Sequence, residues 1–183
     1  SWAFGVVPFL RWSSTSMIFL DVGTGSGHLA RELARQHPKA RVITLDPVRR
    51  LESGLTLPDN VTFVPSRIEQ WNPRRLVGRV DQIYWFFPES LGPEGSWDAV
   101  AAKLADLLKP GGRLTMVSEG GDFVADFTRG LGASGLQVKE FPNLPFQELG
   151  QHEPFILWSG LYVLTSFARA SISKSQSCVI LRA

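Results

Sequence analysis

The chain has 183 residues, of which 44% are hydrophobic and 20% charged, a balance typical of one globular domain rather than of a disordered segment. Its single cysteine excludes a disulfide framework and a cysteine-based zinc cluster, and its three histidines, at positions 28, 37 and 152, form no metal-binding motif. The net charge of +2 is too small to indicate nucleic-acid binding. Because no apolar run reaches the roughly 20 residues of a membrane span, and the apolar opening SWAFGVVPFL lacks the basic start of a signal peptide, we expect a cytoplasmic protein.

Short β-rich runs alternate with helical stretches along most of the chain. Strands are predicted at 17–22, 41–46, 61–64, 80–87, 113–118 and 136–141, and helices at 26–37, 96–108 and 122–131. Pro110-Gly111-Gly112 is predicted to separate the second helix from the fifth strand. This alternation predicts an α/β fold with a mostly parallel sheet that is covered by helices on both faces.

The last forty residues are predicted to add a C-terminal antiparallel hairpin, formed by residues 155–167 and 178–181. The expected architecture is therefore a Rossmann-like, doubly wound sheet of seven strands. We expect a single domain over residues 1–183, with an N-terminal segment at 1–16, a cofactor-binding core at 17–141, and C-terminal strands with a substrate loop at 142–183.

A glycine-rich loop, D-V-G-T-G-S-G at residues 21–27, lies between the first predicted strand and the first predicted helix. Glycines allow the tight turn and the close approach of a ligand to the backbone, and the helix N-terminus offers unpaired N–H groups to an anion. The dinucleotide register G-x-G-x-x-G requires a glycine at position 28, which is His28. The register present is instead D-x-G-x-G-x-G, and a simple tight connection is the alternative without a ligand.

Together with Asp46 at the end of the second strand and L-K-P-G-G before the fifth, this register resembles that of the class I S-adenosylmethionine (SAM)-dependent methyltransferases over residues 17–141. The resemblance implies an enzyme of the EC 2.1.1 type with SAM as cofactor and no metal. It implies that Asp21 lies near the SAM amino group and that Asp46 binds the ribose. Asp46 is equally suited to capping a short helix at 48–52, with Pro47 as its first residue. The implied cofactor-binding residues are Asp21, Gly23, Thr24, Gly25, Gly27, His28, Asp46, Pro47, Arg67, Ile68 and Phe86.

The stretch after the third strand departs from that family. Members often have an acid there that contacts the adenine amino group, whereas this chain has Ser66 and Arg67. Either backbone groups and Ile68 hold the adenine, or the pocket is altered, or Arg67 is an ordinary surface charge.

The acceptor side is predicted at the ends of strands four and five, because ligands of open α/β sheets bind outside the carboxyl ends of the strands. Glu89 and Glu119 are the predicted catalytic bases, with Asp122 as a further candidate. Phe87-Pro88-Glu89 is also similar to a stretch of tRNA guanine-N7 methyltransferases, although the proline-tryptophan and basic run that follow in that family are absent.

The acceptor is therefore predicted to be a small molecule or an RNA base. An RNA would need phosphate contacts from Arg49, Arg50, Arg74, Arg75 and Arg79, for which a solvated surface is the alternative reading. Since a bare core leaves little room for recognition, a partner protein or a further domain is expected to contribute. Two other functions stay open, namely a catalytically inactive, methyltransferase-like binding domain and an oxidoreductase, which His28 disfavours.

Overall fold

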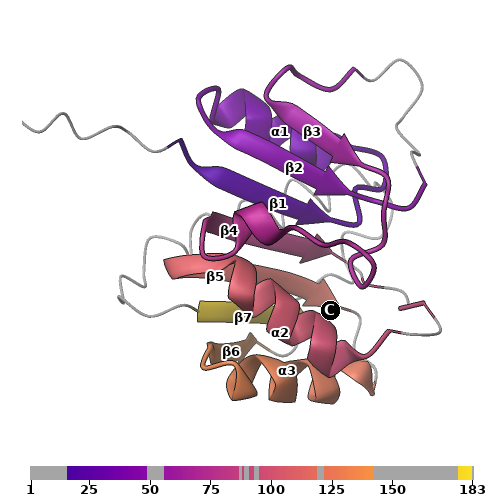
Figure 1. Cartoon of the computed structure of the whole chain (residues 1–183), viewed down its shortest axis with the longest axis vertical. Helices are drawn as coiled ribbons and strands as arrows, with labels where there is room; N and C mark the ends of the chain where they lie inside the picture. The colour runs from indigo at the N-terminus through magenta and orange to yellow at the C-terminus, as the bar shows by residue number, and fades with distance from the viewer. Residues whose placement is uncertain are drawn as a thin grey trace, which may run out of the picture.

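The computed structural model describes residues 16–48, 56–86, 88, 91–92, 95–118, 122–141 and 177–182. Their strands form one sheet in the order β3-β2-β1-β4-β5-β7-β6 (Figure 1). All pairings between neighbouring strands are parallel, which confirms the predicted α/β class with a mostly parallel sheet. The strands are β1 (Ile18–Val22), β2 (Arg41–Leu45), β3 (Val61–Val64), β4 (Val80–Phe86), β5 (Leu108–Ser118), β6 (Gln137–Phe141) and β7 (Ser177–Arg182).

Helices cover both faces of this sheet (Figure 1). Helix α1 (His28–Gln36) buries its apolar stripe against Phe19, Val42 and Tyr84 on one face. Helices α2 (Trp97–Leu107) and α3 (Phe123–Ala133) pack on a larger apolar cluster on the other face. The short helix η1 (Arg74–Leu76) precedes β4. Strands β1 and β2 and the second half of β4 are buried from both sides, which explains why these stretches are mostly apolar in the sequence.

The turn before the fifth strand differs from the prediction. Strand β5 begins at Leu108, which pairs with Val80, and the pairing shifts register before Gln82. Pro110-Gly111-Gly112 thus lies inside β5, at an irregularity, rather than separating it from α2. Gly112 fits there because a Cβ would lie 2.8 Å from the carbonyl oxygen of Lys109 and 3.0 Å from that of Val80.

The predicted antiparallel hairpin at the C-terminal end is wrong. Strand β7 lies between β5 and β6 and pairs with both of them in parallel. A strand has only two hydrogen-bonding edges, so no edge of β7 remains for a hairpin partner. The other predicted hairpin strand, residues 155–167, lies outside the described residues.

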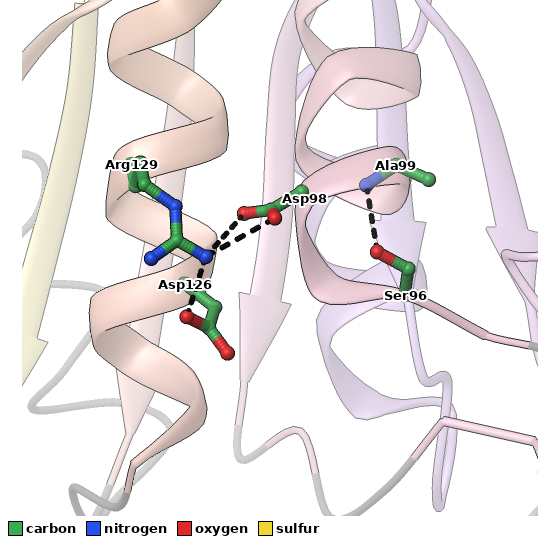
Figure 2. Close-up of polar contacts among 5 residues, drawn as sticks. All are labelled: Ser96, Asp98, Ala99, Asp126 and Arg129. Atoms are coloured by element: carbon green, nitrogen blue, oxygen red, sulfur yellow. Dashed lines mark hydrogen bonds and ion pairs between the residues drawn. The ribbon is translucent and has the colours of Figure 1, made fainter.

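Helices α2 and α3 lie side by side, and each begins at the carboxyl edge of the sheet because it follows β4 or β5 (Figure 1). Ser96 caps α2 by accepting a hydrogen bond from the Ala99 N–H at 3.5 Å (Figure 2). Arg129 of α3 donates to Asp126 Oδ1 at 2.6 Å and to Asp98 Oδ2 of α2 at 3.2 Å. All three side chains are exposed, so these ion pairs contribute little to stability.

Close packing, rather than these charges, joins the two helices. A Cβ at Gly130 would lie 2.8 Å from the Cα of Asp98, 2.9 Å from its carbonyl oxygen and 2.9 Å from the Cβ of Ala101. Two of these atoms are backbone and cannot move without shifting the helix.

None of the helices in the described part of the chain is long and apolar enough to cross a membrane.

We expect Gly130→Ala to lower the free energy of unfolding by about 1–3 kcal/mol, because the added methyl group forces α2 and α3 apart. Gly132→Ala, on the same helix, is the matched control, because a Cβ at Gly132 would meet no atom within 4 Å. That control should be neutral or stabilising by up to about 1 kcal/mol, through helix propensity. Urea unfolding of both variants measures the difference, and equal effects would contradict the close contact.

Candidate functional site

The loop between β1 and α1 depends on its three glycines. Gly23, Gly25 and Gly27 have φ values of 78°, 50° and 87°, a region that other residues rarely adopt. The Gly23 N–H donates to the Leu45 carbonyl at 2.7 Å, and the Gly27 N–H donates to the Thr24 carbonyl at 2.9 Å. The glycine loop is thereby fixed to the end of β2. The positive φ angles of this loop explain why glycine occupies the three G positions of the D-x-G-x-G-x-G register.

Asp21 lies on β1 beneath this loop and is only 3% exposed. The Thr44 hydroxyl of β2 donates to its Oδ2 at 2.9 Å. The hydroxyls of Thr24 and Thr44 are also hydrogen-bonded to each other. Because Thr44 has one hydroxyl proton and donates it to Asp21, Thr24 must be the donor to Thr44. A chain of two threonines therefore connects the glycine loop to the buried carboxylate.

Burial, opposed by the Thr44 hydrogen bond and assisted by the nearby negative charge of Asp46, raises the pKa of Asp21 to about 7. The carboxyl group therefore titrates near neutral pH. A cation placed beside it would favour its ionised form, so the site is suited to a positively charged ligand group.

Asp46 follows β2 and contacts the glycine loop directly. Its Oδ2 accepts the Gly25 N–H at 3.2 Å, and its Oδ1 accepts the Val48 N–H at 2.9 Å. The second bond fits the predicted capping role, but residues 49–52 of the predicted helix lie outside the described residues. A carboxylate has about four acceptor positions, so Asp46 can still accept two hydroxyl donors.

The turn after β3 holds the predicted adenine-side residues. Ile68 is 5% exposed and packs into the core, so its side chain offers little surface to a ligand. The Ser66 hydroxyl donates to the Arg67 carbonyl at 3.1 Å. Arg67 is paired with Glu69 at 3.8 Å, so it is more than an isolated surface charge. Glu69 was not singled out from the sequence.

The aromatic residues of β4 point alternately to the two faces of the sheet. Tyr84 and Phe86 pack on the α1 side, where their rings meet edge to face. Trp85 packs on the other side against Trp97 and Phe127, with ring centroids 5.6 Å apart in each case. A Cβ at Gly23 would lie 3.9 Å from Trp85 Nε1, so the indole supports the glycine loop from below. The alternation of side chains along a strand could have predicted that Tyr84 and Trp85 face opposite sides of the sheet. It could not have predicted that Trp85 lies near Gly23.

The remaining predicted residues are only partly placed. His28 is the first residue of α1 and half-buried, and Pro47 is exposed beside Asp46. Glu89 and Glu119 lie outside the described residues, whereas Asp122 is exposed and directly precedes α3. Within the described ranges, no three His, Cys, Asp or Glu side chains are grouped so as to hold a metal ion. The acceptor side therefore remains a prediction.

Fold and loop together define an α/β protein whose glycine loop lies at the carboxyl ends of β1 and β2, the edge at which open α/β sheets bind their ligands. The sequence pattern of a protein family described as "Methyltransferase domain" matches residues 3–155. The chain belongs to this family. Membership confirms the resemblance to the SAM-dependent methyltransferases and, with it, SAM as the cofactor of the fold.

Solved structures agree on the fold. A structure described as an antibiotic-related methyltransferase has a TM-score of 0.51 and 22% identity, over 67% of this chain and 69% of the other. The antibiotic-resistance methyltransferase Kmr gives 0.51 and 21%, over 67% of this chain and 79% of the other. A second Kmr structure is 27% identical with a TM-score of 0.43, and the alignment covers 54% of this chain and 56% of that protein. The chain thus spans little more than half of that relative. No curated protein gave a match.

We expect Asp21→Asn to stabilise the protein at pH 8 while leaving its fold intact, because the amide oxygen can still accept the Thr44 bond. With a raised pKa in the folded state, wild-type stability is highest when Asp21 is protonated and falls as the pH rises from about 4 to 7. The shift corresponds to about 4 kcal/mol at most.

Thermal unfolding at pH 5 and pH 8 checks this prediction. The gain in Tm of the variant over the wild type should be larger at pH 8. A gain that is independent of pH would show that Asp21 does not titrate in this range.

Proposed function

We propose that this protein is a SAM-dependent methyltransferase that transfers a methyl group from SAM to a small molecule or an RNA base. The observation that carries the proposal is the buried Asp21 carboxyl group beneath the positive-φ glycine loop, with Asp46 at the end of the next strand. Two acids at adjacent strand ends favour a ligand that brings positive charge and a diol. SAM has an ammonium group, a sulfonium and a ribose diol.

Each predicted residue has a role in this proposal. Asp21 receives the ammonium group, Asp46 the ribose hydroxyls, and the N–H groups at the start of α1, beside His28, the carboxylate. Pro47, Arg67, Ile68 and Phe86 line the remaining cofactor surface, Ile68 mainly through its backbone. Gly25 leaves room for the ligand, since a Cβ there meets no protein atom within 4 Å.

SAM supplies an activated methyl group, so the protein has mainly to align the acceptor with it and to exclude water. A base is needed only for an acceptor that loses a proton during transfer. Glu89 and Glu119 remain the proposed bases, because they follow β4 and β5 at the carboxyl edge of the sheet.

The described arginines give little support to RNA binding at this site. Arg74, Arg75 and Arg79 are exposed but precede β4, and they therefore lie near the amino ends of the strands. Phosphates bound there would not bring a base to the carboxyl edge. Incubation with tritium-labelled SAM and, separately, total RNA, ribosomal subunits or a small-molecule extract tests both acceptor classes. Saturable SAM binding without transfer to any pool would favour the inactive binding domain.

We expect the affinity for S-adenosylhomocysteine to rise with pH, because its ammonium group pairs with ionised Asp21. With a pKa of about 7, the Kd should fall about tenfold between pH 6 and pH 8. Calorimetric titration at both pH values measures this change. Asp21→Asn should bind weakly without this pH dependence, and a flat wild-type profile would contradict the role of Asp21.

We expect Gly25→Ala to lower cofactor affinity at least tenfold, since the added methyl group occupies the space left for the ligand and strains a positive φ. Gly78→Ala is the matched control, because Gly78 also has a positive φ, of 68°, and open space around its Cβ position, but precedes β4. Both variants should lose about 1–2 kcal/mol of stability. Equal loss of affinity in both would argue against the glycine loop as the cofactor site.

A further inference from the structure

The turn of residues 67–71 is fixed to α2 by a single lysine. Lys103 Nζ donates to the carbonyl oxygens of Ile68, Glu69 and Trp71 at 2.9, 2.7 and 3.1 Å. Burial lowers the pKa of Lys103, and the charge of Glu69 acts in the opposite direction. The three bonds satisfy all the donors of the ammonium group and hold the backbone of the turn in place.

From this fixed turn, the Glu69 side chain reaches the segment that follows β4. Its Oε1 accepts the Gly92 N–H at 2.6 Å, a short, charge-assisted hydrogen bond. A Cβ at position 92 would lie 2.8 Å from that same oxygen, so a larger residue there would displace the Glu69 carboxylate. The Glu69 side chain is 11% exposed, which protects the bond from competition by water.

The same carboxylate also faces the predicted adenine side. Arg67 Nη1 lies 3.8 Å from Glu69 Oε1, and its side chain is 42% exposed. Glu69 therefore lies between a residue that is open to the cofactor and the backbone of the segment in which Glu89 precedes Gly92.

We propose that Glu69 is a positioning residue that couples cofactor binding beside the β3 turn to the segment following β4, where the acceptor is expected. This inference rests on the proposed function. Glu69 touches no reacting atom. It acts through Gly92 on one side and Arg67 on the other.

Amide NMR spectra of the full chain, with and without S-adenosylhomocysteine, test the coupling. Gly25 reports cofactor binding, and Gly92 reports the segment after β4. In the wild type both resonances should shift on ligand addition. In Glu69→Ala, Gly25 should still shift whereas Gly92 should not, and Glu69→Gln should restore the Gly92 response because its amide oxygen can accept the same bond.

Glu32→Ala is the matched control, since Glu32 is a hydrogen-bonded carboxylate on α1, paired with Arg35, on the other face of the sheet. It should leave both responses unchanged. A Gly92 shift in Glu69→Ala as large as in the wild type would overturn the proposal, as would a wild-type Gly92 that stays unmoved while Gly25 shifts. If the wild-type Gly25 does not shift, the proposed function fails, and the coupling fails with it.

Discussion

The site depends on the burial of one carboxyl group. Asp21 is buried near the end of a central strand, beside a second acid, and among the described residues its carboxylate accepts a hydrogen bond from the Thr44 hydroxyl. Such an arrangement costs folding free energy unless a cation or a proton compensates the charge. The threonine chain connects this carboxyl group to the glycine loop, where we propose that the ligand supplies that compensation.

An acid at the opposite edge of the sheet, where the parallel strands begin, differs from Asp21 in its partners. There Asp81 accepts the Ile18 N–H at 2.8 Å and forms an ion pair with Lys109, so its charge is compensated within the protein. Lys109 belongs to the L-K-P-G-G sequence, which we therefore regard as structural. One edge of the sheet pairs its acid with a cation, whereas at the other edge Asp21 accepts a hydroxyl group and Asp46 accepts two backbone N–H groups. In the proposed function, the ligand supplies the positive charge at that second edge.

The sequence predicted those parts of the structure that depend on local chemistry. A continuous apolar run identified β1, β-rich runs identified β2 and β4, and the glycine spacing identified the loop. Contacts between distant segments could not be predicted in this way. Nothing in the sequence near Thr44 indicates that its hydroxyl group binds Asp21, because pairing of β1 with β2 creates this contact. In the same way, only the folded chain places Glu69 beside Gly92. The parallel pairing of β7 was missed for the same reason, since strand direction depends on the path of the connection and not on the strand's own residues.

The position of β7 has a consequence for the order of folding. Among the described strands, β6 pairs with β7 alone, and 35 residues separate these two strands along the chain. Until residues 177–182 have left the ribosome, none of the other described strands pairs with β6 or with the edge of β5 that β7 occupies in the folded sheet. An open parallel edge invites pairing with other chains. Strand β7 therefore pairs after the other described strands have been synthesised. A chain without residues 177–182 would lack the strand that covers this edge of β5.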